Sequence, residues 1–310
     1  KDKDVKKADF ATNMWDTFTV KGKQYAIPRE AGPTVLYYNK SILQGGGVET
    51  PGEPWTMSGK YREAAVKLTT QDRSVIGTHL GNWRNWVYSA GGDVVDAQEL
   101  KYVLDQQKAV DGLQLYQDFR YRFNAATTPQ ENTEQGFIER FIAGGLAMTA
   151  GVRSAGNNKG FVQPNVGIAQ HPKGSAGRKF VMPGNGLAIV QPNTAPEASW
   201  DVVKWYTSPE FQKMHYSMGI GGVVARSAVL KSEEYLTSSI PREWNEFFAK
   251  GVPDLTVPPK LPNWNEILGK VNSELAEFEN GRETARAATT RISPILNALL
   301  AENASWVASK

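Results

Sequence analysis

The stretch VLYYNK at residues 35–40 decides the fold class. Its first four residues form a short run of branched, aliphatic and aromatic side chains, which is typical of a buried strand. The polar residues Asn39 and Lys40 end this run. Other apolar runs follow at residues 146–149 (LAMT) and 186–190 (GLAIV), and helical patterns separate them. This alternation of strands and helices predicts an α/β fold.

Capping signals predict where some of these helices begin. Thr127 and Gln130 have the spacing of a capping box, and so do Thr194 and Glu197. Ser208 stands before a proline and a glutamate, which predicts an N-cap followed by the first turn of a helix.

The composition is that of a folded protein of about two domains. The chain has 310 residues, of which 40% are hydrophobic, and its mean hydropathy is −0.44. Thirty-five basic and 32 acidic residues give a net charge of +3, so no signature of nucleic-acid or membrane-surface binding is present. There is no cysteine, which excludes disulfides, thiol nucleophiles and thiolate metal sites.

No residue pattern requires a metal, a cofactor or a catalytic centre. The three histidines, His79, His171 and His215, are far apart and form no metal-binding motif. Asp93 and Asp96 follow a Gly-Gly pair and could serve as the carboxylate pair of a glycoside hydrolase, although such a turn is more often merely solvated.

Aromatic residues are abundant, with nine Trp, eleven Tyr and twelve Phe. Residues 81–86, GNWRNW, combine flat rings with polar amides and an arginine. Sugars present apolar C–H faces and hydroxyl edges, so such a mixture suits a carbohydrate site, although any single tryptophan more often packs in a core or an interface.

Five segments together resemble the extracellular solute-binding proteins of ABC importers, in the branch similar to maltose-binding protein. They occur in the order of that family and extend over nearly the whole chain. The segments are residues 21–28 (KGKQYAIP) with 36–40 (LYYNK), 54–56 (PWT), 91–92 (GG), 141–148 (FIAGGLAM) and 197–212 (EASWDVVKWYTSPEFQ).

The resemblance implies a type II periplasmic-binding-protein fold, with two α/β lobes joined by crossovers and a ligand held between them as a hinge closes. The implied crossovers are residues 34–39, 186–192 and the proline-rich 252–262. The implied N-lobe is 1–34 plus 188–255, and the implied C-lobe is 35–187 plus 256–310.

One departure concerns the N-lobe. In the family, further residues precede the segment that matches 21–28 and supply the first N-lobe strands. We therefore expect the N-lobe of this chain to be incomplete and the chain to be a piece of a longer protein, since it has neither an initiator Met nor a signal-like apolar segment.

The resemblance also implies a set of ligand-binding positions. After the strand at 146–149 the family commonly has a Trp as a sugar platform, and Arg153 stands there in this chain. An arginine can stack and can also offer five donors, so an anionic sugar derivative is an alternative to a neutral sugar. The implied ligand-binding residues are Arg29, Glu30, Asn82, Trp83, Arg153, Asn185 and Trp264.

The expected function is to capture a carbohydrate or a carbohydrate-like solute outside the cytoplasm and to deliver it to the permease subunits of an ABC transporter. The expected protein is a monomer without cofactor, metal or nucleic-acid partner, and it is periplasmic or a surface lipoprotein. Two alternatives stay open. One is a carbohydrate-active hydrolase that uses a carboxylate pair, and the other is a ligand sensor that feeds a membrane receptor.

Overall fold

The computed structural model describes residues 5–158, 160–182, 184–218 and 221–308. The chain divides into two units, each built from segments far apart in the sequence. The first unit comprises Lys1–Val35, Gly151–Pro164 and Val181–Pro258, and the second comprises Leu36–Ala150, Asn165–Phe180 and Pro259–Lys310. The lobe boundaries implied by the resemblance remain a prediction. The units differ from them at residues 151–164 and 181–187, which pack within the first unit.

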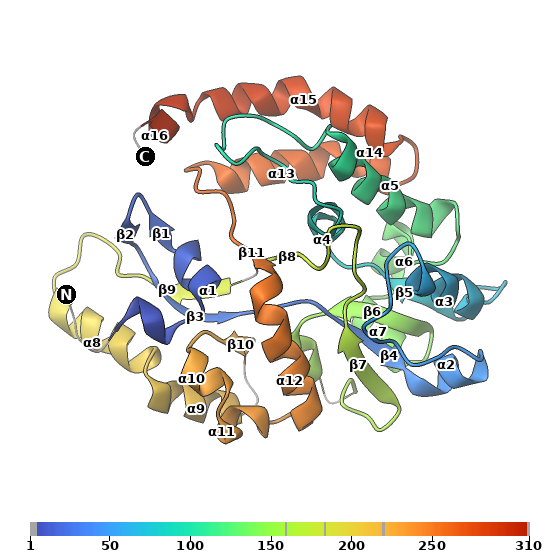
Figure 1. Cartoon of the computed structure of the whole chain (residues 1–310), viewed down its shortest axis with the longest axis horizontal. Coiled ribbons are helices and arrows are strands. Elements are labelled where there is room, and N and C mark those ends of the chain that lie inside the picture. Colours follow the sequence, from blue (N-terminus) through green and yellow to red (C-terminus); the bar gives the residue numbers. More distant parts are fainter. Residues whose placement is uncertain (1–4, 159, 183, 219–220, 309–310) are drawn as a thin grey trace. The chain divides into compact units, whose positions relative to one another are not determined.

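A four-stranded sheet is the main sheet of the structure. Its order is β5 (Ile76–His79), β6 (Leu146–Gly151), β4 (Val35–Asn39) and β7 (Val166–Gln170), as Figure 1 shows. β5 and β6 run parallel, with Ile76 opposite Leu146. All residues of β4 and β7 are buried, which explains their almost unbroken apolar runs. The buried strand predicted at 35–38 is therefore confirmed.

Helices surround this sheet within the second unit. Glycine at position 77 lets α3 approach β5 closely, because a Cβ there would collide with the backbone of Ala65. α4 packs against α5, and α13 packs against α15 (Figure 1). The helices of this unit are α2 (Lys40–Gly45), α3 (Lys60–Leu68), α4 (Trp83–Ser89), α5 (Gln107–Tyr121), α6 (Pro129–Glu134), α7 (Phe137–Ile142), α13 (Trp264–Glu274), α14 (Ala276–Glu279), α15 (Ala285–Ala301) and α16 (Ala304–Ala308).

The first unit contains a small antiparallel sheet. Its central strand, β3 (Ile27–Ala31), pairs with β10 (Val223–Val224) on one side and with β9 (Gly184–Leu187) on the other. The strand predicted at 186–190 is wrong beyond Leu187. The pairing with β3 ends where Leu187 meets Ile27, and Val190 is 78% exposed.

The remaining elements are short. β1 (Thr19–Val20) pairs with β2 (Lys23–Gln24), and β8 (Phe180–Val181) pairs with β11 (Leu255–Thr256). The α-helices of the first unit are α1 (Thr12–Thr17), α8 (Pro196–Tyr206), α9 (Pro209–Ser217), α10 (Ser227–Leu230), α11 (Glu233–Leu236) and α12 (Arg242–Gly251), and the 3₁₀ helices are η1 (Lys7–Asp9), η2 (Arg153–Asn157) and η3 (Val252–Asp254).

Two of the three predicted caps differ from the structure. The capping box before α6 consists of Thr128 and Glu131, one residue beyond the predicted pair. At α8 the N-cap is Ala195, so the box predicted for Thr194 and Glu197 is wrong. Ser208 caps α9 as predicted, since its side chain accepts a hydrogen bond from Phe211 N.

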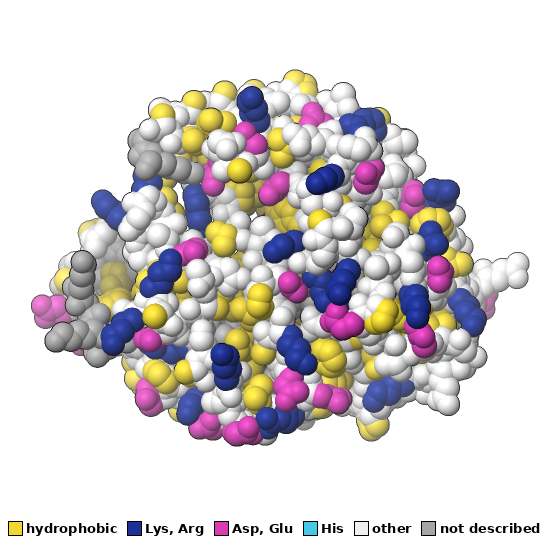
Figure 2. Space-filling view, in the orientation of Figure 1, with side chains coloured by type: hydrophobic (Ala, Val, Ile, Leu, Met, Phe, Trp, Pro, Cys, Tyr) yellow, Lys and Arg dark blue, Asp and Glu magenta, His cyan; other side chains and the backbone are white. Residues whose placement is uncertain are grey.

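Charged side chains of both signs are interspersed over the visible face (Figure 2), in keeping with the small net charge. Within the described residues, no helix combines the length and the apolar character that crossing a bilayer requires.

Candidate functional site

A cavity of about 500 Å³ opens within the first unit. Its wall comes from three segments: the end of β3, the residues around β9 and the loop that leads into β10. A fourth contribution comes from the start of η2. The lining residues are Glu30, Ala31, Gly32, Val152, Ser154, Met182, Gly184, Asn185, Gly221 and Gly222.

A β-bulge brings the polar residues of this wall together. On β3, Glu30 lies opposite Asn185 of β9 and opposite Val224 of β10. The register with β9 shifts between Pro28 and Glu30, so Arg29 has no partner on that strand. Bulges bend a strand and redirect side chains, and they are common beside binding sites. Three predicted site residues, Arg29, Glu30 and Asn185, are thus neighbours in the structure.

Glu30 is the centre of a hydrogen-bond network. Its Oε1 accepts hydrogen bonds from Arg29 Nη2 and from Asn185 Nδ2, the latter at 2.8 Å. Its Oε2 accepts from the Tyr216 hydroxyl at 3.0 Å and from Gly222 N at 2.7 Å. A carboxylate offers about four acceptor positions, so all of them are used. Glu30 therefore organises the wall of the cavity.

The charge state of Glu30 follows from this network. Its side chain is only 6% exposed, and burial by itself raises the pKa of a carboxyl group. The hydrogen bonds from Gly222, Arg29 and Asn185 outweigh burial and lower the pKa of Glu30 to about 2. Arg29 and Glu30 consequently form an ion pair whose charges cancel at neutral pH.

Several polar atoms near the pair keep hydrogen-bonding capacity. Arg29 Nε is buried, and within the described part of the chain it has no partner. Asn185 donates to Glu30 through Nδ2, and its Oδ1 is not used in that bond. Ser154 adds an exposed hydroxyl group to the cavity wall. Asn185 and Ser154, which line the cavity, thus offer polar groups suited to the hydroxyl groups of a small solute.

Arg153 lies beneath this wall and is completely buried. Its Nε donates to Asn245 Oδ1 at 2.9 Å and its Nη1 donates to the Gly221 carbonyl oxygen at 3.1 Å. Its Nη2 donates to the hydroxyls of Ser238 and Ser239, at 3.2 and 3.3 Å. The guanidinium of Arg153, which was predicted to face a ligand, thus donates its hydrogen bonds to groups of the protein itself.

The other three predicted residues belong to the second unit and do not line this cavity. Asn82 is the N-cap of α4 and accepts a hydrogen bond from Arg84 N. Trp83 is 7% exposed, and its Nε1 donates to Asn272 Oδ1 of α13 at 3.0 Å. Trp264 begins α13 and is 8% exposed. These contacts are those of well-packed residues, and a role in ligand binding remains a prediction.

The acidic pair Asp93 and Asp96 lines a different cavity, of about 630 Å³, in the second unit. Burial raises the pKa of Asp93, whose Oδ1 accepts from Val94 N at 2.7 Å. Asp96 Oδ1 accepts from the backbone of Leu100 and Lys101, which closes a turn. In the portion of the chain that the structure covers, no three His, Asp or Glu residues converge as metal ligands.

Two residues of this site were not predicted from the sequence. Tyr216 of α9 donates to Glu30 from 186 residues away along the chain, and nothing local to Tyr216 signals that contact. Ser154 lines the cavity, whereas its neighbour Arg153 was the residue predicted there. Arg29 and Glu30 were implied by the family resemblance, since they follow the segment matched at 21–28.

The sequence matches the model of the bacterial extracellular solute-binding proteins over residues 1–213. The chain belongs to this family. A stretch of 79 residues is also 32% identical to the mannitol-binding protein of Pseudomonas aeruginosa. This stretch covers 25% of this chain and only 17% of that relative's length.

Solved structures of solute-binding proteins share the fold. An ABC substrate-binding protein of Listeria monocytogenes in complex with cycloalternan has a TM-score of 0.85 and 21% identity, over 97% of this chain and 78% of that one. Maltose-bound MalE3 of T. maritima has a TM-score of 0.80 and 22% identity, over 94% of this chain and 77% of that one. An Agrobacterium vitis solute-binding protein with bound D-mannitol has a TM-score of 0.73 and 21% identity, over 98% of this chain and 79% of that one. The predicted two-lobed solute-binding fold is therefore confirmed.

Proposed function

We propose that this chain is the solute-binding component of an ABC importer and that its Glu30 cavity receives an uncharged polyhydroxy solute, a sugar or a polyol. Family membership supports a binding role outside the cytoplasm. The similar proteins named above carry mannitol, maltose or cycloalternan, all of which are rich in hydroxyl groups and uncharged.

The observation that carries this proposal is that Glu30, which lines the cavity, is neutralised by its ion pair with Arg29. A negative ligand would need a free positive charge, but the guanidinium of Arg29 is already paired and that of Arg153 is engaged within the protein. Burial of an unpaired ligand charge is costly. The polar side chains of Asn185 and Ser154 in the lining instead suit neutral hydroxyl groups, and Met182 and Ala31 offer apolar surface for the C–H face.

Delivery follows from the proposed class. The loaded protein would pass its solute to the transmembrane subunits of an importer, acting as a monomer in the periplasm or at the cell surface. A sensor that signals through a membrane receptor would use the same cavity, so co-purification with a permease or with a receptor separates these two roles.

A hydrolase built on Asp93 and Asp96 has weaker support. Asp96 is occupied by the turn that it closes, which leaves one carboxyl group where glycoside hydrolysis generally needs two. Hydrolysis of nitrophenyl glycosides that is lost in Asp93→Asn would favour this second function.

A thermal-shift screen tests the proposal. The protein is heated with D-mannitol, ribitol and maltose and, separately, with hexuronic acids and polyol phosphates. A ligand at a hundred times its dissociation constant adds about 2.7 kcal/mol to the free energy of unfolding. We expect shifts with uncharged compounds. Shifts confined to the acids and phosphates would refute the proposed class.

A further inference from the structure

The peptide group between Gly221 and Gly222 is held at both ends by buried charged side chains. Its carbonyl oxygen accepts a hydrogen bond from Arg153 Nη1 at 3.1 Å. Its N–H group donates to Glu30 Oε2 at 2.7 Å. In a trans peptide these two groups point in opposite directions, so Arg153 and Glu30 hydrogen-bond to the peptide from opposite sides. Hydrogen bonds to charged groups are the stronger ones, so this peptide is firmly fixed.

The clamp matters because both glycines line the cavity. Gly221 has φ +95°, a conformation that favours glycine. We propose that Arg153 is a positioning residue for the solute site. It fixes the Gly221–Gly222 peptide, which in turn orients Glu30 and, through Glu30, the cavity-lining amide of Asn185. This inference rests on the proposed function and assigns to Arg153 a role other than direct contact with a ligand.

The surroundings of Arg153 fit this role. Its guanidinium lies near the Tyr216 and Tyr235 rings, with Cζ 5.8 and 5.3 Å from their centroids, so the buried charge is stabilised by aromatic faces. Asn245 of α12 accepts from Nε and itself donates to three backbone carbonyls, those of Tyr235, Leu236 and Ser238. Asn245 thereby fixes the position of the guanidinium whose Nη1 donates to the Gly221 carbonyl oxygen.

Arginine is needed here because one planar fork serves several acceptors at once. A lysine would retain the charge but offers a single nitrogen, which cannot contact Asn245 Oδ1, the Gly221 oxygen and the two serines together. Arg153→Lys is therefore the informative variant, since it keeps the buried charge while it removes the fork.

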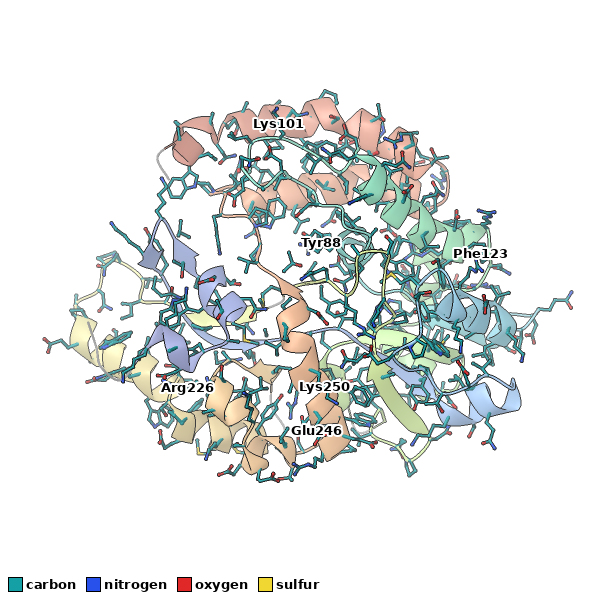
Figure 3. All side chains as sticks on the ribbon, viewed as in Figure 1. Tyr88, Lys101, Phe123, Arg226, Glu246 and Lys250 are labelled. Carbon is teal, nitrogen blue, oxygen red and sulfur yellow. The ribbon has the colours of Figure 1, made fainter. Side chains whose placement is uncertain are left out.

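A second buried arginine of the same unit provides the control. Arg226, labelled in Figure 3, is 6% exposed, donates to the Thr207 carbonyl oxygen and pairs with Asp9. It does not line the cavity. Arg226→Lys should cost stability as Arg153→Lys does, but it leaves the clamped peptide intact.

The experiment combines two measurements on the wild type and both variants, at a temperature where all are folded. Hydrogen exchange of the Gly222 amide without ligand reports the clamp, and calorimetric titration with D-mannitol, ribitol and maltose reports the site. We expect Arg153→Lys to speed Gly222 exchange and to weaken binding, each by about tenfold or more, and Arg226→Lys to change neither. Arg153→Met should show the same effects, more strongly, if it folds.

Unchanged Gly222 exchange in Arg153→Lys, or equal effects of both lysine variants, would overturn the positioning role. If the wild type binds none of the three compounds, the proposed solute class fails, whereas the exchange measurement still decides whether Arg153 holds the peptide.

Discussion

Gly221 has no room for a side chain because a Cβ at this position would collide with Glu30 Oε2 and would lie 3.1 Å from the ring of Tyr216. The close approach is what lets the backbone of the next residue reach the carboxylate. At this point the cavity wall is a close contact between a backbone turn and a buried charge.

Gly221→Ala should accordingly displace Glu30 and weaken solute binding by about tenfold or more, with a loss of about 1–3 kcal/mol in the free energy of unfolding. Gly22→Ala is the matched control, because Gly22 also has a positive φ, +70°, but has no atom within 4 Å of the added carbon. The control should lose stability only. Titration calorimetry and urea unfolding of both variants measure this, and equal binding by the two would contradict the close contact.

Arg29→Met should weaken binding of an uncharged solute by roughly 10- to 100-fold, because it leaves the cavity-lining Glu30 without the cation that neutralises and orients it. Arg242→Met, which alters an exposed arginine of α12 paired with Glu233 and Glu246, should leave binding unchanged. Calorimetric titration of the two variants makes the comparison. If Arg29→Met binds as the wild type does, the pairing of Glu30 with Arg29 does not support the solute site.

Glu30 should give stability a measurable dependence on pH. The pKa of Glu30 is about 2 in the folded chain, against an ordinary value of 4.5. A lowered pKa means that the stabilisation is fully present above about pH 4.5 and is lost as the pH falls toward 2. The difference corresponds to about 3 kcal/mol.

Urea unfolding between pH 7 and pH 3 tests this expectation. The wild type should lose more stability than Glu30→Gln as the pH falls below 4.5, so the difference between their curves should shrink. Curves that stay parallel throughout would show that the carboxylate is not held in its charged form.

The helix caps allow a comparison on stability alone. Ser208→Ala should cost about 1 kcal/mol, because the Ser208 hydroxyl accepts the Phe211 N–H at the start of α9. Thr194→Ala should be nearly neutral, since the cap of α8 is one residue further on and makes no side-chain bond. Thermal unfolding distinguishes the two, and a comparable loss in Thr194→Ala would place the start of α8 at the predicted position.

Local patterns were enough to predict the strand at 35–38 and the cap at Ser208, because each depends on neighbouring residues. The capping boxes at Thr127 and Thr194 failed since serines, threonines and glutamates at a three-residue spacing are frequent, and the helix start is decided by packing. In the first box the neighbouring pair Thr128 and Glu131 supplied the cap instead.

The family resemblance, rather than any local pattern, put Arg29, Glu30 and Asn185 in one predicted set, and strand pairing brings Asn185 to Glu30. Tyr216 reaches Glu30 through helix packing, and no local pattern in the sequence indicates that contact. The role of Arg153 was the least accessible, because a buried arginine and a ligand-facing one look the same in a sequence. Only its four acceptors distinguish them.

The central claim is that a cavity built on a neutralised ion pair takes an uncharged polyhydroxy solute. Titration calorimetry of the wild type with D-mannitol and with mannitol 1-phosphate tests it most directly, because the two differ only in the charged group. We expect D-mannitol to bind and the phosphate ester to bind at least about a hundredfold more weakly. An ester that binds as tightly as mannitol, or more tightly, would contradict it.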